Sequence, residues 1–196
     1  MKKINELKKE YILPYENLGV KRYSNGTTKY GHVPEVAPQA YLITVFNPIS
    51  TEELNALESS IGYAIPNEYS SFLMDFSNGL NLFITCFCLY GFVSKISRQI
   101  GATPQPFSLS LLNIYERPKN SKDTFFFIGG YDYDGSKLYI DKQTGEVHYC
   151  KKNDSASLYC WKNFEDMLSS EIKRLSSLFD DNGKIKIPYE KTLPII

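Results

Sequence analysis

The chain has 196 residues, and 22 Lys and Arg residues balance 22 Asp and Glu residues, so its formal net charge is zero. This length suits one domain with extensions, and an apolar fraction of 42% is that of a folded protein and not of a disordered one. A nucleic-acid-binding protein normally carries a basic excess, because neutralisation of phosphates supplies most of its affinity. The charge balance therefore argues against nucleic acid as a partner.

Residues 1–40 are interpreted as an N-terminal extension. Basic residues begin it but no apolar run follows them, so it does not have the pattern of a secretory signal. A short helix is expected over 5–12, because Ile4, Leu7 and Tyr11 recur at helical spacing. Turn and helix-breaking residues follow it, namely Ser24, Asn25, Gly26, Pro34 and Pro38.

No stretch of the sequence is long and apolar enough to span a bilayer. The longest apolar stretch, 80–93, contains Asn81 and Thr85. We therefore expect a cytoplasmic protein with no membrane partner. Its four cysteines are then expected to stay as reduced thiols.

A strand over 41–46 and a pair of short helices are predicted next. Ser50 and Glu53 form a capping box at the start of the first helix, in which each side chain accepts a hydrogen bond from the other residue's amide. Gly62 ends that helix, and Pro66 suits the first turn of the second. The apolar stripes that identify the two helices are Leu54, Leu57 and Ile61, then Tyr69, Phe72, Leu73 and Phe76.

From Leu80 onward the apolar pattern changes to period two, which predicts strands. Strands are expected over 80–85 and 87–93, then over 125–131, 137–141 and 147–150. Asp134-Gly135 and Gln143-Thr144-Gly145 are hairpin-turn signals between the last three. The irregular stretch 97–120 is expected to contain a short helix over 109–115. Together these elements predict an antiparallel meander.

The last predicted element is a helix with Asn163 as its N-cap and an apolar face that runs to Phe179. Asp181-Asn182-Gly183 ends it, and the segment 184–196 is expected either to add an edge strand or to stay mobile. The chain thus divides into an extension (1–40), an α+β domain (41–180) and a C-terminal tail (181–196).

The order of these elements resembles the SUKH superfamily, which includes the fungal Smi–Knr cell-wall assembly regulators and many bacterial immunity proteins. Ile65 stands where the family typically has Leu, and residues 1–40 match no part of the family pattern. The likeness covers 41–179. It rests on Ile49-Ser50-Thr51-Glu52-Glu53-Leu54 with Leu57, Glu58, Ile61 and Gly62; on Ile65-Pro66-Asn67-Glu68-Tyr69 with Phe72, Leu73, Asn78 and Gly79; on Phe127-Ile128-Gly129 with Asp134, Gly135, Leu138-Tyr139-Ile140-Asp141 and Thr144-Gly145-Glu146-Val147; and on a closing helix introduced by Trp161 and Phe164.

The resemblance implies an α+β fold with a curved, mostly antiparallel β-sheet packed against helices. It also implies a bacterial immunity protein that neutralises a cognate polymorphic toxin, often a nuclease or a deaminase, by binding it, with no catalytic residues. The alternative is a regulatory interaction or scaffolding module like the fungal members, without a toxin partner. An enzyme is a third hypothesis, and it would need a cleft with paired titrating groups.

Partner contacts are expected around the hairpin turn that begins at Tyr131. The segment Tyr131-Asp132-Tyr133-Asp134-Gly135 combines aromatic and acidic side chains, which suit docking against a basic toxin surface. An EF-hand calcium loop is disfavoured there, because a strand stands where further ligands and a closing Glu are needed. The predicted partner-binding residues are Tyr131, Asp132, Tyr133, Asp134, Glu68 and Asp75. The tyrosines and aspartates of the hairpin are expected to be exposed, and Asp132, Asp134, Glu68 and Asp75 are expected to contribute to one acidic face.

The cysteines are interpreted as structural, and His148 is expected to be an exposed strand residue, while His32 in the extension indicates no function. Cys86, Cys88, Cys150 and Cys160 lack the paired knuckle spacing of a structural zinc site, so we favour small thiols in the core. His148 and Cys150 would share a strand face, but no residue that would orient such a nucleophile pair is evident. The chain contains no phosphate-loop, dinucleotide-binding, zinc-protease or serine-hydrolase motif, and no cofactor is expected.

Overall fold

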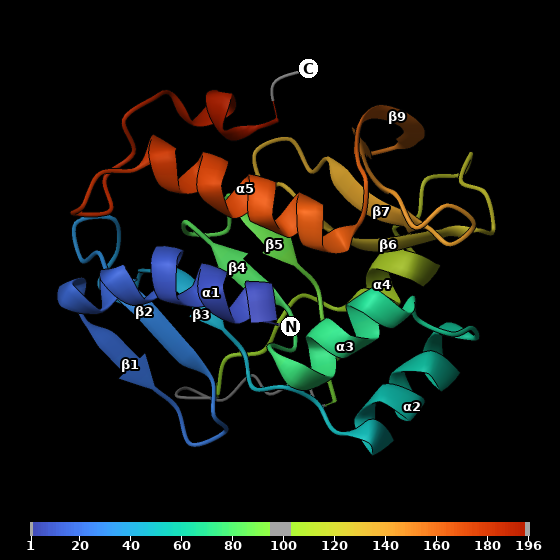
Figure 1. Cartoon of the computed structure of the whole chain (residues 1–196), viewed down its shortest axis with the longest axis horizontal. Helices are drawn as coiled ribbons and strands as arrows, with labels where there is room; N and C mark the ends of the chain where they lie inside the picture. Colours follow the sequence, from blue (N-terminus) through green and yellow to red (C-terminus); the bar gives the residue numbers. More distant parts are fainter. Residues whose placement is uncertain (1, 95–102, 195–196) are drawn as a thin grey trace.

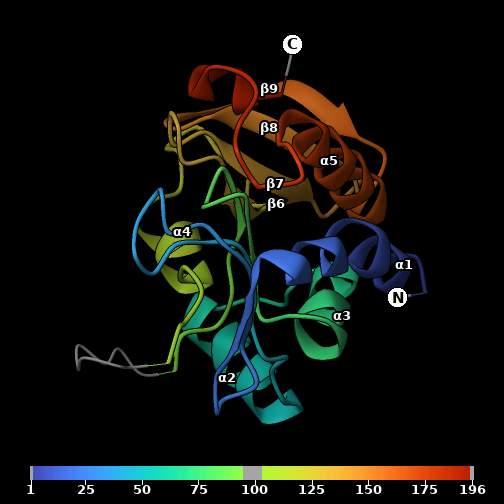
Figure 2. The same cartoon turned by 90° about the vertical axis from the view of Figure 1, so that its left-hand side faces the viewer.

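The computed structural model describes residues 2–94 and 103–194. Its centre is a nine-stranded sheet in which each strand pairs with the next one along the chain, always antiparallel. The curved sheet carries α1, α3 and α5 on one face and α4 on the other (Figures 1 and 2). This arrangement confirms the expected α+β class.

The bounds of the elements are as follows. The strands are β1 (Val20–Arg22), β2 (Thr28–His32), β3 (Tyr41–Val45), β4 (Leu80–Leu82), β5 (Phe87–Leu89), β6 (Phe125–Gly130), β7 (Lys137–Asp141), β8 (Val147–Lys151) and β9 (Asp154–Trp161). The helices are α1 (Lys2–Tyr11), α2 (Thr51–Ile61), α3 (Asn67–Asp75), α4 (Leu109–Ile114) and α5 (Phe164–Leu178), with short 3₁₀ helices η1 (Leu13–Leu18) and η2 (Tyr189–Thr192).

Residues 2–40 supply one α-helix, one 3₁₀ helix and two strands to this fold. The helix expected over 5–12 is present as α1, and β1 and β2 extend the sheet beyond β3. Ile4, Leu7 and Ile12 are buried in the main core. The boundaries at 40/41 and 180/181 stay predictions, although the extension shares its sheet with the rest of the chain.

The predicted helix caps are present. The Ser50 amide donates to the Glu53 carboxylate (2.9 Å), and the Glu53 amide donates to the Ser50 hydroxyl (3.3 Å). The Asn163 side chain accepts from the Asp166 amide at 2.8 Å. Pro66 precedes α3 and does not lie in its first turn. Local side-chain chemistry therefore sets where these helices begin.

The strand expected over 80–85 is shorter than predicted, because β4 ends at Leu82. Phe83, Ile84 and Thr85 follow it with φ angles of +50°, +55° and +69°, a left-handed conformation that is unfavourable for residues other than glycine. Phe83 is fully buried, and its ring stacks on Phe179 with centroids 4.3 Å apart. Burial of the Phe83 ring offsets the free-energy cost of the left-handed backbone. The period-two pattern of the sequence gives no sign that the strand ends here.

Strand β9 was not predicted. Its pairing with β8 shifts register on both sides of Cys150, so β9 carries extra residues and loses the regular alternation of inward and outward side chains. The helix expected over 109–115 is present as α4, and the part of that irregular stretch at 97–102 lies outside the described residues. No helix among the described residues is long and apolar enough to cross a membrane.

The main core lies between the sheet and α1, α3 and α5. Tyr69 is fully buried at its centre, and its hydroxyl lies 2.5 Å from the Tyr90 carbonyl oxygen and 3.0 Å from that of Ile128. It thereby satisfies backbone groups of β6 and of the segment after β5. A smaller core on the other face packs α4 against β6, β7 and β8; its members are Leu112, Phe125, Phe127, Tyr139 and Cys150.

Gly129 is a site where backbone crowding excludes any side chain. A Cβ atom there would lie 2.0 Å from the Cys88 carbonyl oxygen of the neighbouring strand. We predict that Gly129→Ala lowers the free energy of unfolding by at least about 4 kcal/mol, measured by chemical denaturation. Gly145→Ala is the control, because φ there is +78° but no atom lies within 4 Å, and it should cost only about 1–2 kcal/mol. Equal losses in the two variants would contradict this prediction.

Candidate functional site

The turn between β6 and β7 presents three of the predicted partner-binding residues to solvent. The Tyr131 amide donates to the Ser136 carbonyl (3.0 Å), and the Gly135 amide donates to the Tyr131 carbonyl (3.1 Å). The Asp134 carboxylate accepts from the Ser136 amide at 2.9 Å. These bonds hold the turn in one conformation, with the side chains of Asp132, Tyr133 and Asp134 exposed.

Tyr131 is not exposed, so this part of the prediction is wrong. Its residue exposure is 2%, and its ring packs edge-on against Phe87 and Tyr149. The reason is a bulge in β6, where the pairing with β7 shifts between Phe127 and Gly129. One extra residue reverses the face on which later side chains lie, so Tyr131 points into the main core.

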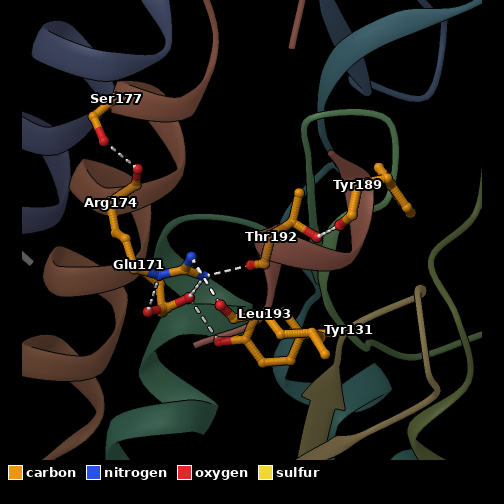
Figure 3. Close-up of polar contacts among 7 residues, drawn as sticks. All are labelled: Tyr131, Glu171, Arg174, Ser177, Tyr189, Thr192 and Leu193. Carbon is orange, nitrogen blue, oxygen red and sulfur yellow. Dashed lines mark hydrogen bonds and ion pairs between the residues drawn. The ribbon is translucent and has the colours of Figure 1, made fainter. Parts of the chain in front are cut away.

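The buried Tyr131 hydroxyl donates to the carboxylate of Glu171 on α5 at 2.7 Å (Figure 3). Burial, and then the negative charge of Glu171, raise the pKa of the Tyr131 phenol well above its usual value. Tyr131 therefore stays protonated and is a permanent donor to Glu171. This bond ties the turn to the helix beneath it.

Arg174 neutralises Glu171 inside the protein. Its Nε lies 2.9 Å from one carboxylate oxygen and its NH2 nitrogen 2.6 Å from the other, a two-point ion pair in which the Glu171 side chain is 3% exposed. The same guanidinium donates to the carbonyl oxygens of Thr192 (2.8 Å) and Leu193 (3.4 Å). Arg174 thus also holds the C-terminal segment (Figure 3).

The C-terminal segment returns to the turn. The buried Thr192 hydroxyl donates to the Tyr189 carbonyl at 2.7 Å, and the Tyr189 ring meets the Tyr133 ring edge-on with centroids 5.9 Å apart. Over 181–194 the segment forms one isolated bridge, Phe179 with Ile185, and η2. It adds no strand to the sheet within that range.

A cleft of about 410 Å³ lies beside the turn, on the face of the sheet opposite α5. Its floor includes Cys88 and Tyr90, and the Tyr90 ring packs against Phe107 with centroids 5.1 Å apart. Burial is the main cause of the raised pKa of Tyr90, and the charges of Glu116 and Asp132 add to it. The charged lining residues are Glu116, Asp132, Asp134, Lys137 and Lys152.

The family model described as the SMI1/KNR4 family (SUKH-1) matches residues 48–170, more than half of the 196 residues. This chain belongs to the SMI1/KNR4 family, SUKH-1. The match confirms the family resemblance in the sequence. No curated protein matches the chain.

Of the four residues predicted to contribute to one acidic face of this SUKH-1 protein, Glu68 lies away from Asp132 and Asp134, although all of the predicted partner-binding residues lie within the matched region. Glu68 is exposed at the start of α3, where it accepts from the Phe164 amide (3.0 Å) and shares a cavity with Ile140 and Lys142. That cavity is at the end of β7 opposite to the turn. Asp75 is exposed at the end of α3. The role of Glu68 and Asp75 in partner binding stays a prediction.

Several exposed apolar residues over 107–115, of which Phe107 lines the cleft, were not predicted from the sequence. Phe107 and Tyr115 are 45% and 78% exposed, and Leu111 and Ile114 on α4 are about half exposed. The short helix buries Leu109 and Leu112 instead, and Asn113 fixes it to β6 by two hydrogen bonds to Phe127. The high density of apolar residues over 107–115 is the sequence feature that could have indicated them.

The histidine and cysteine side chains form no activated site in the described residues. His148 stacks on Tyr139 and shares its face with Cys150, as the strand predicted, but its side chain is only 15% exposed, so the expectation of an exposed residue is wrong. Burial raises the pKa of Cys150 to about 12, so its thiol is protonated and a poor nucleophile. Among the described residues, no three His, Cys, Asp or Glu side chains are placed to hold a metal ion.

The thiols provide a test of these burial patterns. All four cysteines are free; Cys86, Cys88 and Cys150 are buried as expected, but Cys160 is exposed, so the expectation of a core thiol is wrong there. We predict that one thiol per chain reacts rapidly with a disulfide reagent at pH 8 in the folded protein, and four in denaturant. Cys160→Ser should abolish the native reaction. Rapid modification of a second thiol in the folded protein would contradict the structure.

The Glu171–Arg174 pair provides a test of the network. Arg174→Leu leaves the Glu171 charge buried and unpaired, and should lower the free energy of unfolding by about 3 kcal/mol, the lower end of the range for broken buried pairs. The double variant with Glu171→Gln removes that charge and keeps an acceptor for Tyr131. It should therefore be more stable than Arg174→Leu alone in denaturant titrations. A less stable double variant would contradict a charge-based account.

Proposed function

We propose that this SUKH-1 protein is a non-catalytic bacterial immunity protein of the cytoplasm that neutralises a cognate toxin protein by direct binding. Family membership supports this function. The observation that carries it is the rigid turn that exposes Asp132, Tyr133 and Asp134 beside an aromatic-lined cleft. An inhibitor needs such a preformed surface more than it needs a reactive group.

The chemistry of the turn suits protein recognition. Tyr133 is 50% exposed, and a tyrosine offers a large contact area at low conformational cost. Asp132 and Asp134 flank it and would attract a basic surface, which raises the association rate. The hydrogen bonds within the turn fix its backbone before binding, so little further ordering opposes association.

The groups in the cleft support binding rather than catalysis. Burial raises the pKa of the Cys88 thiol, so its nucleophilic form is suppressed. Burial lowers the pKa of Lys137, yet its ammonium nitrogen already donates to the Lys152 carbonyl at 2.9 Å. The charges of Asp132 and Glu116 act on Cys88 and Lys137, respectively, and each favours the protonated form of its neighbour, in contrast to the nucleophile–base pairs that nucleophilic catalysis requires.

Co-expression tests the proposed function directly. The protein should be produced together with the protein encoded by the adjacent gene, with growth and capture on an affinity tag as readouts. Rescue of growth and a stoichiometric complex are expected. If the neighbouring protein is toxic and neither rescue nor a complex is observed, the immunity function is wrong for that pair, and a regulatory module without a toxin becomes the better hypothesis.

Variants of the turn test the surface. Tyr133→Ala should weaken the captured complex about 30-fold, the effect of losing about 2 kcal/mol at a central anchor. Asp132→Asn with Asp134→Asn keeps the side-chain acceptor for Ser136 and should mainly slow association and reduce its salt dependence. Tyr159→Ala is the matched control, since Tyr159 on β9 is 45% exposed. Equal affinities for all variants would show that the partner binds elsewhere.

A further inference from the structure

We infer that the C-terminal segment Tyr189–Leu193 is part of the partner-binding surface and that Tyr189 is a second aromatic anchor beside Tyr133. The inference rests on the proposed function and adds to it a residue, a supporting network and the chemistry of the partner. Tyr189 lies 19 positions after the last residue of the family match at 170, and no sequence pattern singles it out.

The two tyrosines form one exposed pair. Their ring centroids are 5.9 Å apart with an interplanar angle of 68°, and the residues are 50% and 37% exposed for Tyr133 and Tyr189. An edge-to-face pair leaves the open face of one ring available to a partner. The hydroxyl of Tyr189 also interacts with Cys86, a buried residue in the segment between β4 and β5. The two rings are therefore exposed to solvent, while the contact with Cys86 holds the Tyr189 side chain in place.

A series of contacts leads from Tyr131 to Tyr189 (Figure 3), and the ring contact of Tyr189 with Tyr133 closes it. It starts at Tyr131 in the turn, passes through Glu171 and Arg174 on α5, and reaches the carbonyl of Thr192. The Thr192 hydroxyl then binds the Tyr189 carbonyl, and the Tyr189 ring returns to the turn at Tyr133. The turn and the C-terminal segment, 58 positions apart at Tyr131 and Tyr189, are thus fixed relative to each other.

Arg174 is a positioning residue in this series. The hydrogen bonds of its guanidinium go to Glu171, Thr192 and Leu193, and not to the exposed tyrosines. Its guanidinium donates in two directions at once, to the carboxylate below the turn and to the carbonyls of the segment. A residue with one donor group cannot make both connections, so the arrangement requires the planar fork of arginine.

The partner that fits this surface is a protein with an exposed arginine. Asp132 and Asp134 flank Tyr133 in the sequence, the charge of Asp132 also acts on Tyr189, and neither aspartate forms an ion pair within the part of the chain that the structure describes. A guanidinium stacks on tyrosine rings and pairs with carboxylates in the same geometry. Tyr133 and Tyr189 would supply the rings on which the guanidinium stacks, and Asp132 would supply the carboxylate with which it pairs.

The test uses the full-length protein and the protein encoded by the adjacent gene. Tyr189→Ala should weaken the complex by about 10- to 30-fold, as loss of an aromatic anchor does, while Tyr189→Phe keeps the ring and most of the affinity. Tyr159→Ala is again the matched control. Arg174→Gln should accelerate hydrogen exchange in the peptide that covers 131–136 in the free protein. A merely stabilising role of Arg174 would raise exchange throughout the chain.

The outcomes separate this inference from the proposed function. If the wild type binds and Tyr133→Ala weakens binding but Tyr189→Ala does not, Tyr189 is not an anchor and the immunity function stands. If exchange over 131–136 is the same in Arg174→Gln and the wild type, the segment does not hold the turn. If the wild type neither binds nor rescues growth, the proposed function fails and the anchor role fails with it.

Discussion

The buried ion pair between Glu171 and Arg174 is the interaction on which the exposed surface depends. Burying a carboxylate is costly unless a cation and further donors satisfy it, and here Arg174 and the Tyr131 hydroxyl do so together. Because Arg174 also binds the carbonyls of Thr192 and Leu193, one charge pair positions a β-turn and the end of the chain. The pair adds specificity of arrangement rather than net stability, since an apolar replacement of similar volume would avoid the cost of burying two charges.

The network can work because α5 and the sheet already form a rigid base. Tyr69 links α3 to β6 and to the segment after β5 through two backbone carbonyls, and its ring packs against Phe72, Phe126 and Phe164. Side chains in such a core leave few alternative positions. The left-handed residues after β4 border the same corner, where the Thr85 hydroxyl lies 3.4 Å from the Asp132 carboxylate. Strain in the backbone is therefore located next to the proposed binding surface, as is common at functional sites.

Sequence patterns predicted the parts of this protein that local chemistry controls. Ser50, Asn163 and Gly62 marked the helix ends, because caps satisfy backbone groups within a few residues of themselves. Asp134-Gly135 marked the turn for the same reason, and Asp132 to Asp134 are exposed there. The orientation of Tyr131 was not predictable, since it depends on the bulge near Ile128, and a single extra residue exchanges the two faces of a strand. Strand β9 was not predictable for the same reason, because the register shifts in its pairing with β8 interrupt the alternation of inward and outward side chains.

The sequence by itself determined the α+β class, the order of most elements, the family and the turn that carries the candidate site. Those features follow from periodicity, caps and turn residues, all of which act over short distances along the chain. Only the tertiary structure decided that Tyr131 is a buried donor, that Glu68 lies at the other end of β7, and that Tyr189 meets Tyr133. Contacts such as Arg174 with Thr192 are set by the packing of α5 against the rest of the chain. A single sequence contains no local signal for them, because their energy arises only when distant segments exclude water together.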